Sequence, residues 1–373
     1  MKNIYKGIFL ALLLIGLIAF YIQLNKIDDN IQKETIYKTN HNVEKISEGQ
    51  EIKSYHYSLD WDKYFLEYKY IRDDPNIGPS AYVETYYDNK EISTVMIDYT
   101  WDDYKLRDNR TLKTVWINNN EAIFIDWSNQ VYLYNTTLDS KSLINFPKNV
   151  FGSTSFDINK ESDKIVFSTH GSSRTVYIYN LENKSLEKIY KTEKGSTQPG
   201  SWLLKNAWGT DNNIYFDSIT ENHEQIIKKY NLSNEEITTF AEDSYILNIS
   251  PDKRYLTYID KLKNLTVVYD LKKNIQFEIP YSEELLWLPT NNQFVSVEDN
   301  KLLTINTLNK NVIVTEKYDI GYLIKEDELI YNLQYVNSNI RFDIVDFEIV
   351  EQSFGEVLNK INNVTTYELE IGK

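Results

Sequence analysis

Paired carboxylates are the first residues of this sequence whose types could do chemistry. Asp73 and Asp74 are adjacent, and so are Asp102 and Asp103. Two carboxyl groups about 5–9 Å apart can hydrolyse glycosides as an acid with a base or a nucleophile. The chain has 55 acidic residues, however, and charged side chains mostly lie on solvated surface. A glycosidase-like pair therefore stays open as a hypothesis, and no residue is assigned to catalysis.

Patterns for metal binding and for a nucleophile are weaker still. Asp157, Asn159, Glu161 and Asp163 alternate like calcium ligands, but Ser162 stands where a calcium loop has glycine. We interpret this stretch as a turn. No two of the four histidines have zinc-ligand spacing, and the chain contains no Gly-x-Ser-x-Gly elbow for a serine nucleophile. The sequence thus predicts no metal site and no cofactor.

Tryptophans recur at equivalent places before predicted strands. Trp116, Trp208 and Trp287 each precede a strand by six or seven residues, and Ile158 and Ile249 take the same place elsewhere. Exposed tryptophans at these places could stack on sugars. A position that alternates Trp with Ile is more typical of packing between structural units, so we predict a core role.

The amino-terminal segment predicts a membrane anchor. Residues 4–24 are apolar except for Lys6 and Gln23, a length close to the ~20 residues that cross a bilayer. Lys2 and Lys6 precede its uncharged part, residues 7–22, and Asp28 and Asp29 follow, so the remaining chain is expected outside the cytoplasm. A cleavable signal peptide is the alternative, but the end of the run lacks the small residues of a cleavage site. The predicted organisation is an anchor at 1–24, a tether at 25–50 and a globular domain at 51–373.

Charge and cysteine content narrow the cellular setting and the partners. The net charge of −15 argues against a nucleic-acid partner. There is no cysteine, whereas extracytoplasmic eukaryotic domains of this size usually contain disulfides. We expect a single-pass protein of a bacterial cell membrane, with its carboxy-terminal domain facing outwards.

A repeated unit predicts the architecture. Residues 247–260 read LNISPDKRYLTYID, in which a polar turn precedes a run that favours a β-strand. Six weaker copies bring the total to seven. The seven turns begin at Asp60, Asn118, Glu161, Thr210, Ser250, Thr290 and Lys325.

A second marker, an Asn or Asp that ends a strand before a polar turn, recurs every 36–51 residues. The marker residues are Asn135, Asn180, Asn231, Asp270, Asn306 and Asp346. Units of about 40–45 residues with four short strands indicate an all-β protein, a β-propeller. In the clearest unit, residues 245–250, 254–260, 265–271 and 275–280 are the expected strands, counted outwards from the centre.

We predict a seven-bladed β-propeller behind one N-terminal transmembrane helix, with six or eight blades as alternatives. Two segments, 35–47 and 364–372, are left over after seven units have been assigned. They could together form an eighth blade, or the second could complete the seventh. Closure of a propeller often uses strands from both chain ends, because an open ring would expose sheet edges.

The turn at Ser250-Pro251-Asp252-Lys253 resembles the Ser-Pro-Asp-Gly turn of TolB-like propellers, although Lys253 replaces the family's glycine. Only this copy is close to the motif, and WD-repeat proteins are a poorer match because no Trp-Asp pair closes the third strands. The resemblance implies a propeller that binds proteins, peptides or glycans, and it implies no chemistry of its own.

Long predicted loops point to a binding surface on the first four blades. Connections between second and third strands and between blades emerge on one face, and functional residues concentrate on long loops. The long loops are expected at 72–80, 99–110, 169–174, 192–201 and 218–223. The candidate contact residues are Arg72, Asp73, Asp74, Trp101, His170, Arg174 and Trp202.

Two functions fit this sequence. The first is a membrane-tethered extracytoplasmic propeller that binds or scaffolds envelope proteins, peptides or wall glycans. The alternative is a carbohydrate-active enzyme, a glycoside hydrolase or lyase, that uses Asp or Glu at the mouth of the propeller. The first is preferred because no catalytic motif was found.

Overall fold

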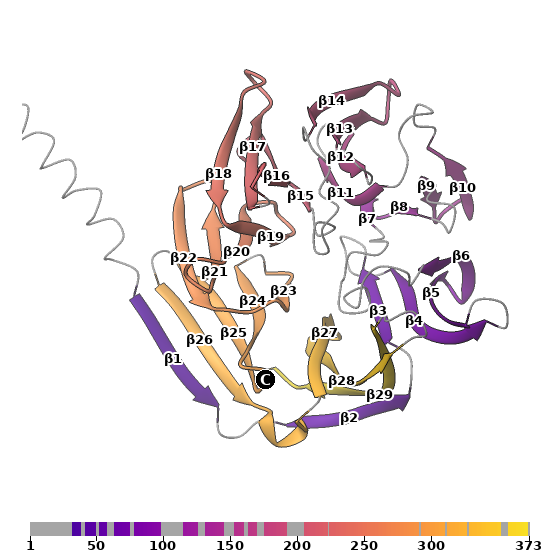
Figure 1. Ribbon diagram of the computed structural model, residues 1–373, viewed down its shortest axis with the longest axis vertical. Coiled ribbons are helices and arrows are strands. Elements are labelled where there is room, and N and C mark those ends of the chain that lie inside the picture. The colour runs from indigo at the N-terminus through magenta and orange to yellow at the C-terminus, as the bar shows by residue number, and fades with distance from the viewer. Residues whose placement is uncertain are drawn as a thin grey trace, which may run out of the picture.

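The computed structural model describes the larger part of the chain from Gln32 onwards, and its strands form a ring of β-sheets (Figure 1). The described residues are 32–38, 42–49, 52–57, 63–74, 78–97, 115–125, 131–144, 153–159, 163–169, 175–191, 205–222, 224–290, 292–309, 312–326, 328–351 and 357–371. They form seven antiparallel sheets, one of which gains a parallel fifth strand. The predicted all-β, seven-bladed propeller is therefore confirmed. Among these residues no helix has the length and hydrophobicity needed to cross a bilayer, and the predicted anchor lies outside them.

Blades are numbered here along the chain from β3. Blade 1 contains β3 (Ile52–Tyr57), β4 (Tyr64–Asp74), β5 (Gly78–Tyr87) and β6 (Lys90–Ile97). Blade 2 contains β7 (Val115–Asn118), β8 (Glu121–Ile125), β9 (Val131–Asn135) and β10 (Ser140–Leu143). Blade 3 contains β11 (Ser153–Asn159), β12 (Lys164–Thr169), β13 (Thr175–Asn180) and β14 (Leu186–Lys191). Blade 4 contains β15 (Asn206–Trp208), β16 (Asn213–Ile219), β17 (Gln225–Asn231) and β18 (Ile237–Glu242).

The last three blades include the strands from both ends of the chain. Blade 5 contains β19 (Ser244–Ile249), β20 (Tyr255–Asp260), β21 (Leu265–Asp270) and β22 (Ile275–Pro280). Blade 6 contains β23 (Leu285–Trp287), β24 (Gln293–Glu298), β25 (Leu302–Asn309), β26 (Val312–Asp319) and β1 (Gln32–Lys38). A 3₁₀ turn, η1 (Gly321–Leu323), precedes blade 7, which contains β27 (Glu328–Val336), β28 (Asn339–Glu351), β29 (Val357–Leu369) and β2 (Val43–Gly49).

Blade 5 matches the four strands predicted for the clearest repeat. Ser250 shapes its first turn, because its hydroxyl donates to Asp252 Oδ1 at 2.6 Å and accepts from the Tyr255 backbone N–H at 2.9 Å. Lys253 has a φ of 63°, in the left-handed region that favours glycine. The glycine of the TolB-like turn thus has a conformational reason, and Lys253 takes up that conformation at a cost in strain.

The Asn and Asp markers are hairpin caps where the repeat is regular. The Oδ1 atom of Asn180 accepts from the backbone N–H groups two and three residues further on, at 2.9 and 3.0 Å. Asn135, Asn231 and Asp270 make the same pair of hydrogen bonds. This is the turn-forming chemistry that the sequence predicted for these positions.

The repeat changes in the last two blades, where three predictions were wrong in detail. Asn306 lies inside β25 opposite Thr315, buried in the ladder, and Asp346 lies inside β28. The turn that begins at Lys325 leads into β27, which is the first strand of blade 7 and not its second. Local strand patterns do not reveal which place in a blade a strand takes, because that place depends on pairing with distant strands.

The N-terminal strands form a belt along the outer side of blades 6 and 7 (Figure 1). β1 adds to β26 in parallel register, and β2 pairs antiparallel with β29 as the outermost strand of blade 7. The stretch interpreted as a tether is therefore part of the propeller from Gln32 onwards. The described strands form seven blades and not eight: residues 364–369 belong to β29, the third strand of blade 7, and β2 adds the fourth strand that completes it.

Aromatic side chains pack between neighbouring blades, as predicted for the recurring tryptophans. Trp116 of blade 2 lies with its ring centroid 4.8 Å from that of Phe65 in blade 1. Trp287 of blade 6 stacks on Tyr255 of blade 5, with centroids 5.4 Å apart. Trp208 is buried among apolar residues of blades 3 and 4. Since all three tryptophans are buried, they are core residues and not a stacking platform for sugars.

The interface between blades 7 and 1 contains a buried polar network. Asn332 of β27 donates to Asp343 Oδ2 at 2.7 Å and to the Lys53 backbone carbonyl at 2.8 Å. Its own amide oxygen accepts from the Ser54 hydroxyl at 2.8 Å, and Thr366 donates to Asp343 Oδ1 at 2.8 Å. Burial raises the pKa of Asp343 to about 6. The network joins the first strand of blade 1 to the last blade through directional hydrogen bonds.

Asp343 should make the stability of the fold depend on pH. Its folded-state pKa is raised, so the stability it contributes is full below about pH 4 and falls as pH rises through about 6. The free energy of unfolding should therefore drop by about 3 kcal/mol between these limits, relative to an Asp343→Asn variant. The asparagine can replace the carboxyl because the Thr366 hydroxyl can turn from donor to acceptor. Urea unfolding of both proteins from pH 4 to 7.5 tests this, and parallel curves would rule it out.

Candidate functional site

The residues proposed as contacts from the sequence are only partly covered by the described structure. Arg72, Asp73 and Asp74 lie in β4, and their backbones pair with Ser80, Pro79 and Gly78 of β5. This part of the expected loop at 72–80 is therefore an extended hairpin.

The side chains of these three residues lie outside the described structure. Trp101, His170, Arg174 and Trp202 lie outside the described residues altogether. The binding surface predicted on blades 1–4 stays a prediction.

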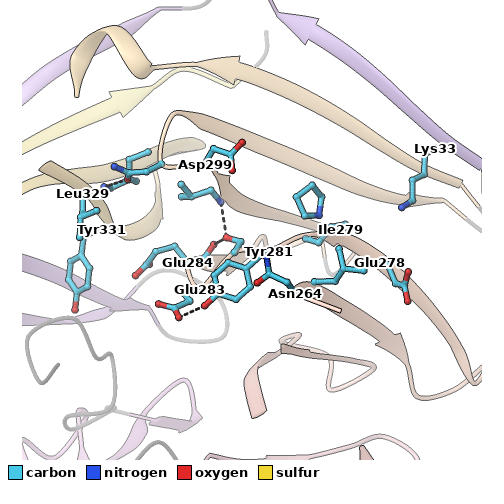
Figure 2. A pocket seen from close by; sticks show the side chains of 16 residues that line it. Lys33, Asn264, Glu278, Ile279, Tyr281, Glu283, Glu284, Asp299, Leu329 and Tyr331 are labelled. Carbon is cyan, nitrogen blue, oxygen red and sulfur yellow. Dashed lines mark hydrogen bonds between the residues drawn. The ribbon is translucent and has the colours of Figure 1, made fainter. Parts of the chain in front are cut away.

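A groove of about 760 Å³ lies on the other side of the ring, over blades 5, 6 and 7 (Figure 2). Its wall comprises residues 264–265, 278–284, 297, 299–300 and 329–331, together with Lys33 of β1. Three of these segments belong to connections between second and third strands or between blades. Such connections emerge on the face of a propeller that is expected to bind ligands. The volume is within the range of about 300–1,000 Å³ that is typical of ligand pockets.

A carboxylate held by two tyrosines is the most organised part of the groove. The Tyr281 hydroxyl donates to Glu283 Oε1, and the Tyr245 hydroxyl donates to the same oxygen at 3.3 Å. Burial, followed by the hydrogen bond to Glu283, raises the pKa of Tyr281 to about 12. The pKa of Tyr245 is raised as well, mainly by burial. Both phenols therefore remain protonated donors at neutral pH, and they orient Glu283.

The segment that carries Glu283 is braced by the buried Ser282. Its backbone N–H donates to Thr266 Oγ1 at 2.9 Å, and its hydroxyl donates to the Glu284 carbonyl at 2.7 Å. The same hydroxyl accepts from the Val297 backbone N–H at 3.0 Å, which ties the segment to blade 6. Residues 281–284 are thus held from both blades, so the position of Glu283 is set by the scaffold.

The second-to-third turn of blade 6 supports the opposite wall. Asn300 accepts from the Ile330 backbone N–H at 2.8 Å through Oδ1 and donates to the Glu328 carbonyl at 2.8 Å through Nδ2. Asp299 and Asn300 both have positive φ values, near 51°, which Asp and Asn tolerate better than most residues. The turn exposes Asp299 beside the groove and joins blade 6 to β27.

The groove is electronegative. Four carboxylates line it, from Glu278, Glu283, Glu284 and Asp299, against the single lysine Lys33. Glu278 is paired with Lys263 at 2.8 Å, outside the lining. Within the part of the chain that the structure describes, no three His, Cys, Asp or Glu side chains come together as a metal site. Charge and hydrogen-bonding capacity therefore favour a cationic or neutral polar ligand.

Sequence reasoning missed this groove because blades 5–7 have short connections. The available signal was the stretch Tyr281-Ser282-Glu283-Glu284, in which an aromatic residue and two acids follow directly after a strand. Nothing local to that stretch shows that Asp299 and Tyr331 lie on the same groove, since they come from two further blades.

The comparisons with known proteins show similarity at the level of the fold alone. No family model matches the chain, and no curated protein is significantly similar in sequence. Among solved structures, an oligogalacturonate lyase from Vibrio parahaemolyticus superposes with a TM-score of 0.53 at 10% identity, covering 90% of this chain and 98% of the lyase. The resemblance to TolB-like propellers remains a prediction. The chain is structurally similar to that lyase as a seven-bladed β-propeller.

Proposed function

We propose that this protein is a membrane-tethered, extracytoplasmic propeller that acts as a binding module, and that the groove over blades 5–7 is a ligand site. The observation that carries the proposal is the Glu283 carboxylate, which two protonated tyrosines orient in a groove of ligand size. A polar group held on a rigid scaffold is typical of a binding site. The envelope location is supported by the apolar run at 4–24, which only residues 25–31 separate from β1.

A carbohydrate-active enzyme is the second candidate. Carboxylates in the groove and the fold shared with an oligogalacturonate lyase support it. Two properties count against uronate chemistry at this groove. Its four carboxylates would repel a polyanionic substrate, and the raised pKa of Tyr281 makes its phenolate a poor candidate for a base. Binding is therefore the preferred function.

Photocrosslinking in intact envelopes tests the binding function. Tyr281→p-benzoyl-L-phenylalanine places a reactive ketone on the exposed Tyr281 position, and Leu138→p-benzoyl-L-phenylalanine places it on an exposed turn of blade 2. We expect a discrete light-dependent adduct from position 281 and none from position 138. Equal labelling at both positions, or no adduct at either, would contradict a ligand site over blades 5–7. Release of unsaturated or reducing ends from wall glycans or pectate by the purified protein would support the enzyme instead.

A further inference from the structure

We propose that the groove binds an extended peptide segment that inserts a lysine side chain beside Glu283 and runs along the free edge of β22. This inference rests on the proposed binding function and names the class of its ligand. Three features of the groove carry it: an unpaired strand edge, an oriented carboxylate with a free oxygen, and the net charge of the lining.

The strand edge is the first feature. β22 pairs with β21 on one side only, and no described strand covers its other side. Residues 278–280 of β22 line the groove, so this edge borders the space that a ligand would fill. An extended peptide can bind such an edge through its backbone N–H and C=O groups, as an added strand. A sugar chain has no matching alternation of donors and acceptors.

Blade 6 shows that the outer edge of a blade in this propeller accepts another strand. β1 pairs in parallel with β26 over residues 32–38, beyond the four strands that complete the blade. The neighbouring edge of β22 has the same place in blade 5, and Figure 1 shows the two edges on the outer side of adjacent blades. The fold thus provides an internal example of the pairing that we propose for a ligand.

The oriented carboxylate is the second feature. Both tyrosine hydroxyls bind Oε1 of Glu283, while Oε2 accepts no hydrogen bond from any described residue. The free oxygen can accept from an ammonium group, which donates up to three hydrogen bonds as a compact point charge. The fixed position of the segment 281–284 lowers the entropic cost of forming that ion pair.

The charge of the lining is the third feature. Among the described residues of the lining, four carboxylates stand against one lysine. Three of these carboxylates remain after Glu278 has paired with Lys263, so a cationic segment is attracted and an acidic one is repelled. Lys33 opposes a cationic ligand, and its removal should strengthen binding. A purely structural role of Glu283 and Lys33 would not produce effects of opposite sign.

Titration calorimetry with short capped peptides tests the proposal on the full-length protein in detergent. The probe is acetyl-TKTKT-amide, in which threonines favour the extended conformation and lysines supply ammonium groups. We expect binding that weakens at least tenfold in Glu283→Gln, because the neutral amide loses the charge-assisted hydrogen bond to the lysine ammonium group. Lys33→Gln should strengthen binding, and Glu182→Gln, the same change on an exposed turn of blade 3, should leave it unchanged.

Three further ligands separate the sources of affinity. The peptide acetyl-TETET-amide should not bind, and a TKTKT peptide with N-methylated threonines should bind weakly because it cannot pair with β22. Binding of tetraglucosamine without binding of the peptide would overturn the peptide inference and leave the groove as a ligand site. Equal peptide affinities in Glu283→Gln and the parent protein, with unchanged melting temperatures, would also overturn it. Photocrosslinking at position 281 reports on the binding function independently of these ligands.

Discussion

A chain that starts at Glu51, and so lacks both N-terminal strands, is expected to aggregate or to lose cooperative unfolding. β2 supplies the outermost strand of blade 7 and leads directly into blade 1, so it joins the two ends of the ring. Its six residue pairs with β29 average one backbone hydrogen bond each and correspond to about 6 kcal/mol at roughly 1 kcal/mol per net hydrogen bond. That is comparable to the whole stability of a typical protein, about 5–15 kcal/mol.

Two longer chains are the controls for this deletion. A chain that starts at Gln32 retains both belt strands and should unfold cooperatively. A chain that starts at Asn42 loses only β1, which is a fifth strand, and should keep a closed ring with a lower melting temperature. Circular dichroism melts and size-exclusion chromatography distinguish the three. A soluble, cooperatively folding chain from Glu51 would show that β2 is not required for closure.

Asp157→Ala is expected to lower the free energy of unfolding by about 3–4 kcal/mol, the usual cost of breaking a buried ion pair. Asp157 of blade 3 accepts from the Trp208 backbone N–H of blade 4 at 2.6 Å and forms an ion pair with Lys253 of blade 5. Its side chain is only 8% exposed. One carboxylate thus connects three blades, and its removal leaves a donor and an ammonium group without their partner.

Matched variants separate the charge at this site from the backbone strain. Asp157→Asn keeps an acceptor for the Trp208 N–H, so it should lower the free energy of unfolding less than Asp157→Ala does. Lys253→Gly should be about 1 kcal/mol more stable than Lys253→Ala, because glycine adopts the φ of 63° without strain. Urea unfolding measures the free energy of unfolding of all four variants. Additive effects of Asp157→Ala and Lys253→Ala in the double variant would mean that the ion pair contributes nothing.

Local chemistry was sufficient to predict the repeat. The turn at Ser250 and the caps at Asn135, Asn180, Asn231 and Asp270 depend on hydrogen bonds within a few residues, so their sequence pattern reports their structure. The recurring tryptophans were predicted to be core residues for a similar reason. Isoleucine occupies the equivalent position in other repeats, and a position that accepts both residues is typical of a buried apolar site. Blade number followed from counting these local units.

Long-range pairing decided what the sequence could not show. Residues 32–49 read as a polar tether because β2 is almost entirely exposed and β1 is solvated, so neither carries an apolar pattern. Their place in the fold comes from ladders to β29 and β26, which are distant in sequence. The contact residues predicted on the long loops of blades 1–4 stay a prediction, because four of the seven residues and the side chains of the other three lie outside the described structure.

By itself, the sequence determined an all-β chain of seven units, the type of turn in the regular units and the burial of the tryptophans. The repeat and its turns depend on hydrogen bonds between a side chain and the backbone a few residues away. Burial of a tryptophan requires only an apolar environment, whichever strands provide it. Only the tertiary structure decided how the ring closes, that Asp157 spans three blades, and that Glu283, Asp299 and Tyr331 line one groove. These depend on segments that meet only when the propeller is complete, and loop closure over such separations leaves no local pattern in the sequence.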